Sequence, residues 1–279
     1  MTTPDVVGLG AILLGGVLVA VMMWALHRLF VIATIVRTLW HASPTDTPEP
    51  TPGQPIALTG TVVVDAPAPI AERLFAPTDR PVGAYLWRAW FTDTGRYTYD
   101  RERGELRKGR NTFAAGIEVG DVGLTANGHR FGLDFAWLRT LYDADRLADL
   151  EIGTPTQNTK LPTFFTRYSW DSLYLAVSTP RGDCDLAQLT DVVSTARESV
   201  DTDGFGVEAR GLTAGQRVFV YGELRENADG DYTIGGTDTT PLLVSTTGRE
   251  GLFAHLRWRA LKYLLALGGA VGLFVLFVL

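Results

Sequence analysis

Few residues in this chain could do chemistry, and their spacing does not suit it. Three of the four histidines, His27, His41 and His255, lie beside long apolar segments, and His129 follows an Asn-Gly pair. A Ser-His-Asp triad needs a histidine within hydrogen-bond reach of a serine. No Gly-x-Ser-x-Gly motif supplies that serine. We therefore expect His129 to be an exposed turn residue.

The single cysteine, Cys184, lies between Asp183 and Asp185. Neighbouring carboxylates raise the pKa of a thiol, whereas a nucleophilic cysteine needs a lowered one. One cysteine also excludes an intramolecular disulfide and a cysteine-based zinc site. We predict that Cys184 is not catalytic.

Motifs for phosphates and metal ions are also missing. No Gly-x-x-x-x-Gly-Lys-[Ser/Thr] loop occurs. Asp201, Asp203 and Gly204 resemble part of a calcium loop, but Glu208 follows the glycine too closely for an EF-hand. The sequence therefore predicts no catalytic residue, no cofactor and no metal site, and it favours a non-enzymatic role.

Both ends of the chain are apolar. Val6–Leu26 carries no charge and is long enough to cross a bilayer, with Asp5 before it and Arg28 after it. That charge order is the reverse of a signal peptide. We predict a span at about 6–26, continued by a juxtamembrane helix to residue 41. Tyr263–Leu279 is also uncharged and predicts a second span at about 260–279, within a C-terminal segment 256–279.

Basic residues predict the orientation of both spans. Arg28 and Arg37 follow the first span. Before the second span come Arg249, Arg257, Arg259 and Lys262. Cytoplasmic loops carry an excess of Lys and Arg. We therefore expect an integral cell-membrane protein that contacts the lipid bilayer, with a cytoplasmic centre and both termini outside.

Glycines lie at helical spacing in both spans. They are Gly8, Gly15 and Gly16 in the first span, and Gly268, Gly269 and Gly272 in the second. Small faces of this kind let membrane helices approach closely. The two spans are expected to pack together, or to form an oligomer through these faces.

The centre predicts one β-rich domain, residues 56–255, after a Pro-rich linker at 42–55. Strands are expected at 56–64, at 83–99 with a turn at Asp93–Gly95, and in a hairpin of 217–222 with 232–234. Asn127–Gly128 predicts a further turn. Apolar stripes predict helices at 134–150 and 185–200. The fold class is a membrane-anchored α+β, mainly β domain, a small barrel or a sandwich, between two transmembrane helices.

Several aromatic residues are candidates for an interaction surface with a protein partner: Trp87, Trp90, Phe164, Phe165 and Trp170. The block 164–175 is very apolar. It is interpreted first as core, with a docking patch or a membrane-facing surface as the alternatives.

Charge usage limits the kinds of partner. The net charge is −6, whereas nucleic-acid-binding domains normally carry a basic patch, so no nucleic-acid partner is expected. Lysine occurs only three times, and aspartate outnumbers glutamate. This style resembles proteins of salt-loving archaea, in which acidic surfaces maintain solubility.

Several segments in order resemble the GIDE-type membrane ubiquitin-protein ligases. They are Gly60 in the first strand, Leu74–Pro77 with Pro81–Trp87, Gln216–Leu224, Asp229–Ile234 and Pro241–Thr246. The similar region runs from about Leu58 to Leu265. It implies the family's "beside a membrane" (BAM) domain between two spans. Activity in the family resides in a RING, which needs eight Cys or His zinc ligands, and this sequence cannot supply them.

Three functions remain open from the sequence. The first is a non-catalytic membrane-anchored binding or scaffold domain. The second, implied by the resemblance alone, is RING-type E3 ubiquitin transfer with the RING supplied by another chain. The third is a lipid- or small-molecule-binding domain that uses the apolar block.

Overall fold

The computed structural model describes residues 4–41, 51–75, 79–100, 105–142, 146–152, 173–195, 204–226 and 230–278. The chain divides into two compact units. Met1–Ser43 with Arg249–Leu279 form a helical unit, and Pro44–Gly248 form a β-rich unit. The linker predicted at 42–55 lies mostly outside the described residues, and its last residue, Pro55, begins a strand.

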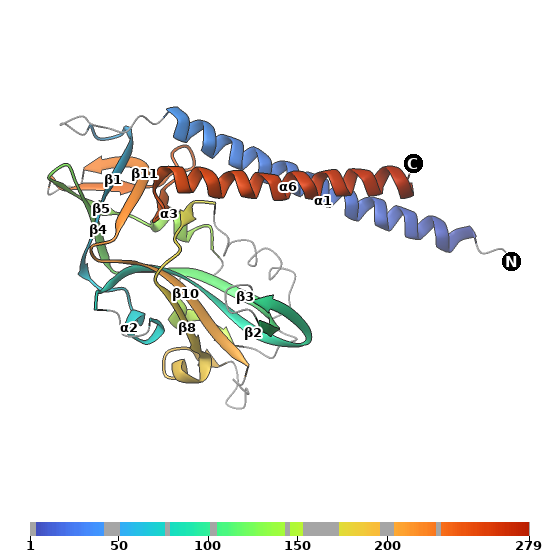
Figure 1. The fold of residues 1–279 in the computed structure, drawn as a ribbon, viewed down its shortest axis with the longest axis horizontal. Coiled ribbons are helices and arrows are strands. Elements are labelled where there is room, and N and C mark those ends of the chain that lie inside the picture. Colours follow the sequence, from blue (N-terminus) through green and yellow to red (C-terminus); the bar gives the residue numbers. More distant parts are fainter. Residues whose placement is uncertain are drawn as a thin grey trace. The chain divides into compact units, whose positions relative to one another are not determined.

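The helical unit consists of α1 (Pro4–His41) and α6 (Gly248–Val278), shown in Figure 1. Both helices are long and apolar enough to span a membrane, over Ile12–Trp40 and Gly248–Leu276, each 29 residues. At 1.5 Å per residue this is about 43 Å, the thickness of a bilayer with its headgroups.

The second helix begins earlier than the sequence predicted. α6 starts at Gly248, so residues expected to form a connection before a span at about 260 are helical. Leu252 and Leu256, four residues apart, are both fully buried. This stripe favours a helix, and a prediction based on uncharged length alone overlooked it.

An aromatic contact and a hydrogen bond join α1 to α6. The rings of Trp24 and Tyr263 meet edge to face, with centroids 5.2 Å apart. Further along, the Arg249 guanidinium donates a 2.7 Å hydrogen bond to the carbonyl of Leu39. The last carbonyls of a helix lack partners within it, so a cation there is favourable. Because Trp24 meets Tyr263 while the later residue Leu39 meets the earlier residue Arg249, the two helices run antiparallel.

The predicted glycine face of the second span is open. A Cβ atom placed on Gly16, Gly268, Gly269 or Gly272 would meet no atom within 4 Å. In the first span, by contrast, Gly15 is buried.

Five strands of the β-rich unit close into a barrel in the order β1-β4-β5-β12-β11, and β11 pairs back with β1. All neighbours are antiparallel except β5 and β12. The strands are β1 (Pro55–Ala66), β4 (Asp121–Ala126), β5 (His129–Leu133), β11 (Arg217–Glu226) and β12 (Tyr232–Gly235). β13 (Leu243–Ser245) and β7 (Leu175–Ala176) extend the sheet beyond β11. OB folds are also small five-stranded barrels, but the architecture alone does not indicate a ligand.

The strand β1 closes the barrel by pairing on both sides. Its residues Pro55–Thr61 pair with β11, and Thr61–Ala66 pair with β4. Gly60 lies at this change of partner. A Cβ there would lie 2.5 Å from the carbonyl oxygen of Thr125, so only glycine allows the two strands to approach this closely.

The predicted hairpins of the barrel are confirmed. β11 and β12 pair antiparallel, and Gly230 before β12 has a φ of 85°. Asn127 and Gly128 connect β4 to β5 with φ values of 51° and 81°. Positive φ at both central residues is typical of a type I′ hairpin turn. A mainly β domain was predicted, and of the two architectures considered the barrel is found.

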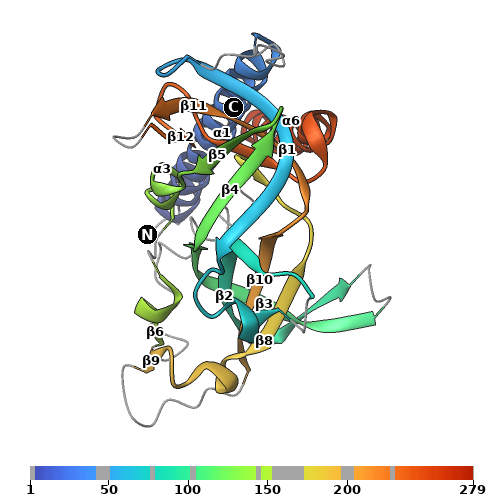
Figure 2. The same cartoon turned by 90° about the vertical axis from the view of Figure 1, so that its left-hand side faces the viewer.

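A second sheet is inserted between the barrel strands, in the order β3-β2-β10-β8, and Figure 2 shows it beside the barrel. Its strands are antiparallel: β2 (Val82–Asp100), β3 (Glu105–Val119), β8 (Arg181–Asp185) and β10 (Phe205–Thr213). One face packs with α2 (Ala71–Leu74) and η2 (Leu186–Leu189) into a second core around Trp87. The remaining elements are α3 (Ala136–Arg139), η1 (Leu147–Asp149), β6 (Glu151–Ile152) and β9 (Ser194–Thr195).

The turn predicted at Asp93–Gly95 is wrong. β2 continues through it, with Asp93 opposite Gly109 and Tyr97 opposite Lys108. Three residues of β2 therefore have no counterpart in the pairing. Such extra residues make a bulge in a strand and leave the hairpin intact.

The two long helices predicted inside the domain are also wrong. Among their described residues, 134–150 contains only α3 and η1, and 185–200 contains η2 and β9 after the last residue of β8. Leu138 packs in the barrel core, whereas Leu147 and Leu150 pack in the second core. The chain crosses from one core to the other between them, so its apolar stripe does not form one continuous helix.

Gly206 on β10 fits closely beneath Trp90 on β2. A Cβ at Gly206 would lie 2.3 Å from Cζ2 of the indole, which is itself 5% exposed. We expect Gly206→Ala to lower the free energy of unfolding by about 1–3 kcal/mol, because the indole must leave its rotamer. The unfolding midpoint of the full-length protein in detergent measures this.

The control is Gly206→Ala in a Trp90→Ala background, which lacks the indole. There the substitution should lower the free energy of unfolding far less, since the clashing ring is absent. Equal costs in both backgrounds would show that the glycine matters for the backbone and not for the contact.

Candidate functional site

The aromatic surface expected from the sequence is only partly described. Phe164, Phe165 and Trp170 lie outside the described residues. Trp87 is fully buried in the second core, and Trp90 is 5% exposed. Trp87 packs in the second core, whereas Trp90 is covered by the Arg110 guanidinium and by the close approach of Gly206. For these two residues the expectation of a surface role is corrected.

The end of the apolar block is core. Leu173 and Leu175 are buried, and Leu175 packs in the barrel core next to β13. For these residues the first interpretation, a buried segment, is the one found.

A group of charges lies on the other face of the second sheet, which we call the charged face: Arg88, Arg110, Asp183, Glu208 and Arg210. Arg88 and Glu208 lie opposite each other on β2 and β10 and form an ion pair, in which Nε donates at 3.0 Å. Arg110 donates to Asp183 at 3.0 Å and lies over the Trp90 ring, 3.8 Å from its centroid.

The charged face carries charges of both signs. Glu208 lies within 4.0 Å of Arg110 and 3.9 Å of Arg210. The side chains are 15–39% exposed. Arginine forks are suited to planar carboxylates. Arg110, whose side chain is 30% exposed, is placed to meet an acidic group of a partner.

Glu118 on β3 is a buried carboxylate, 2% exposed, whose Oε1 accepts the backbone N–H of Leu147 at 2.6 Å. Burial raises its pKa, and the Leu147 hydrogen bond, Arg139 and Arg146 oppose this effect. Tyr85 lies opposite on β2 and donates to the carbonyl of Pro69 at 2.6 Å. Burial, and next the charge of Glu118, raise the pKa of Tyr85.

The two residues that could have been nucleophile or base do not meet. Cys184 is buried, and burial, then Asp185 and Asp183, raise the pKa of its thiol. The expected effect of the two carboxylates is thus confirmed. His129 is exposed at the start of β5, as predicted, with its ring 6.5 Å from that of Phe131. Within the described ranges, no three His, Cys, Asp or Glu side chains gather as metal ligands.

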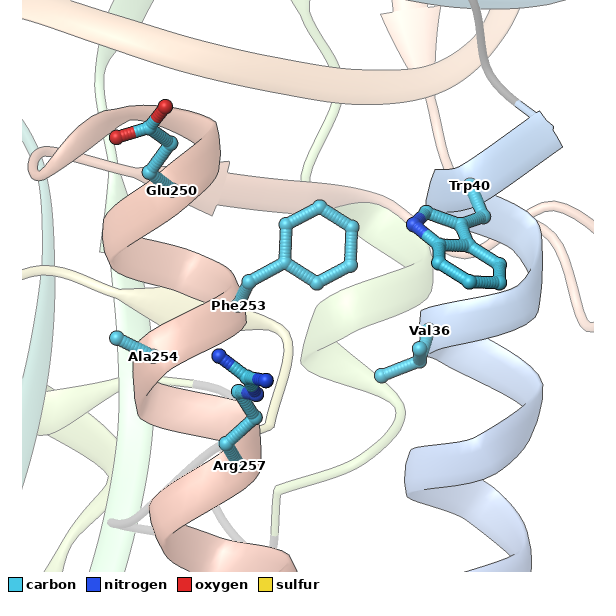
Figure 3. A pocket seen from close by; sticks show the side chains of 6 residues that line it. All are labelled: Val36, Trp40, Glu250, Phe253, Ala254 and Arg257. Atoms are coloured by element: carbon cyan, nitrogen blue, oxygen red, sulfur yellow. The ribbon is translucent and has the colours of Figure 1, made fainter.

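The helical unit contains a groove of about 490 Å³ between α1 and α6. Val36 and Trp40 line it from α1, and Glu250, Phe253, Ala254 and Arg257 line it from α6. Figure 3 shows Trp40 and Val36 on one side, Phe253 and Arg257 on the other, and the Glu250 carboxylate pointing away from Phe253. Residues 250, 253, 254 and 257 share one helix face by their spacing. That spacing is visible in the sequence, but the prediction used only the basic residues of this segment.

Comparisons of the chain with known family models, with curated proteins and with solved structures found no match. The geometry of the charged face and of the groove must therefore carry the functional argument.

Stability should depend on pH through Glu118. A carboxyl whose pKa is raised by folding favours the protonated form, so its contribution is full below the ordinary pKa and is lost as pH rises through the raised one. Glu118→Gln removes the buried charge and keeps an acceptor for Leu147. We expect this variant to unfold at a higher temperature than the original protein at pH 8, and the difference to vanish near pH 4.

The matched control is Glu72→Gln, since Glu72 is exposed. Unfolding midpoints from pH 4 to pH 8 should move in parallel for this variant and the original protein. A constant offset for Glu118→Gln across that range would contradict the buried-charge explanation.

Proposed function

We propose that the chain is a two-span integral membrane protein that displays a non-catalytic binding domain. The observation that carries this proposal is a band of exposed apolar side chains on both helices. It runs from Ile12 to Phe30 on α1 and from Trp258 to Leu276 on α6. Each band is about 28 Å long, which matches the hydrocarbon thickness of a bilayer.

The orientation in this proposal comes from the basic residues. Arg37 follows the band on α1, and Arg249 and Arg257 precede it on α6. The Arg249–Leu39 hydrogen bond supports a common side for these ends. A basic side is cytoplasmic, so the β-rich unit is proposed to be cytoplasmic and both termini outside.

The charged face supports a binding role for the β-rich unit. Its arginines are held in place by ion pairs and by the stacking of Arg110 on Trp90. A partner that adds a carboxylate gains charge-assisted hydrogen bonds without the cost of ordering these side chains. We propose that the partner is a protein that presents an acidic segment to Arg110.

In-cell cross-linking of the full chain, followed by mass spectrometry, tests this function. A reproducible partner should be lost in Arg110→Gln and kept in Arg217→Gln, which removes an exposed arginine of β11. Both variants must keep the original unfolding midpoint. Equal recovery of the partner with both variants would exclude the charged face, and recovery of no partner would contradict the binding role.

The resemblance to GIDE-type ligases supports a second proposal of a different class. A ubiquitin-transferase role would need a RING from another chain, which brings zinc bound to Cys and His. We expect no zinc and no conjugation of a ubiquitin-like protein in the purified complex if the domain only binds. Stoichiometric zinc with conjugation would favour the ligase role.

A further inference from the structure

We propose that the groove between α1 and α6 binds the headgroup of an anionic phospholipid from the surrounding bilayer. This inference deepens the proposed function, because it rests on the insertion of both helices in a membrane. The ligand is a lipid of the leaflet on the Arg257 side of the bilayer. Its phosphate binds Arg257, and the part of its headgroup beyond the phosphate lies against Phe253.

The position of the groove along the helices is the first argument. The exposed apolar bands end at Phe30 on α1 and begin at Trp258 on α6. Arg257 directly precedes Trp258 at the band edge, and Val36 lies about 9 Å beyond Phe30 at 1.5 Å per residue. Phospholipid headgroups occupy a layer of about 5–8 Å on each side of the hydrocarbon. Arg257 therefore lies at the inner boundary of this layer and Val36 near its outer boundary, whereas Trp40, about 15 Å beyond Phe30, lies past it.

One aromatic residue agrees with this level. Trp258 is 59% exposed at the edge of the band. Tryptophan is enriched where hydrocarbon meets headgroups, because its ring is apolar and its N–H is polar. Trp40, 79% exposed, lines the groove farther from the band.

The charges around the groove are the second argument. Within the described part of the chain, no carboxylate or carbonyl pairs with the exposed Arg257 guanidinium. The Arg249 guanidinium lies 5.7 Å from the Phe253 ring, on the side of the helix start. Two cations therefore flank Phe253, and the Glu250 carboxylate points away from it.

The shape of the groove is the third argument. Its volume of about 490 Å³ lies within the range of small-molecule sites. Its walls are mainly apolar, and it is also lined by Arg257, which pairs with no described carboxylate or carbonyl. Basic pockets between membrane helices are suited to anionic headgroups, whereas a free inorganic phosphate would leave the apolar walls uncovered.

The test uses the full chain in vesicles of phosphatidylcholine that contain about one third phosphatidylglycerol. The protein is extracted in mild detergent, and native mass spectrometry counts the lipids that remain bound. We expect phosphatidylglycerol to be enriched over its share of the bilayer. Arg257→Gln should reduce this enrichment about fivefold, the effect of roughly one charge at a membrane surface.

Two further variants separate the groove from general electrostatics. Arg37→Gln removes an equal charge from an exposed residue of α1 that does not line the groove, and it should keep most of the enrichment. Ala254→Phe fills the groove at constant charge, and it should displace the bound lipid. Equal losses in Arg257→Gln and Arg37→Gln, or no enrichment in the original protein, would overturn the inference.

Flotation of the same vesicles in a density gradient distinguishes the two proposals. A protein that floats after an alkaline wash but shows no enrichment contradicts only the lipid site. A protein that is stripped from the vesicles contradicts membrane insertion and the lipid site together.

Discussion

The pairing of β1 with two partners is the constraint on which the β-rich unit depends. The strand pairs with β11 over its first half and with β4 over its second, and Thr61 belongs to both pairings. This closure leaves the barrel without a free edge along β1. It also requires a residue without a side chain at Gly60, where the carbonyl of Thr125 approaches.

The second sheet shares its strands with the barrel core. Leu86 on β2 and Leu212 on β10 face the barrel core, whereas their neighbours Tyr85 and Trp87 face the second core. The charged face begins where the barrel core ends, since Arg88 follows Leu86 on the same side of β2. The two cores therefore hold the arginines on a rigid strand.

Much of the local structure was readable from the sequence. The turns at Asn127–Gly128 and before β12 depend on residues that accept a positive φ, and they form as predicted. The long apolar ends are helices, as expected for uncharged apolar runs of this length. The barrel strand order was not readable, since it depends on contacts far apart in the chain such as Thr59 with Phe219.

The candidate sites were harder to predict than the fold. Trp87 and Trp90 suggested a surface because large aromatics stand out in a sequence, but the second core buries Trp87 and Arg110 covers Trp90. Arg88 and Glu208 come together only through the register of β2 with β10. The groove needs α1 and α6 side by side, and their contacts join residues far apart in the chain, such as Arg249 with Leu39.

The β-rich unit is joined to a helix at each of its ends. On one side the connection is the proline-containing segment before Pro55, and on the other only Thr246 and Thr247 separate β13 from α6. A protease that cuts the chain once, in either connection, leaves the folded unit covalently attached to the other helix. Two cuts are needed to release the domain, so shedding by a single cleavage is excluded by the order of the elements.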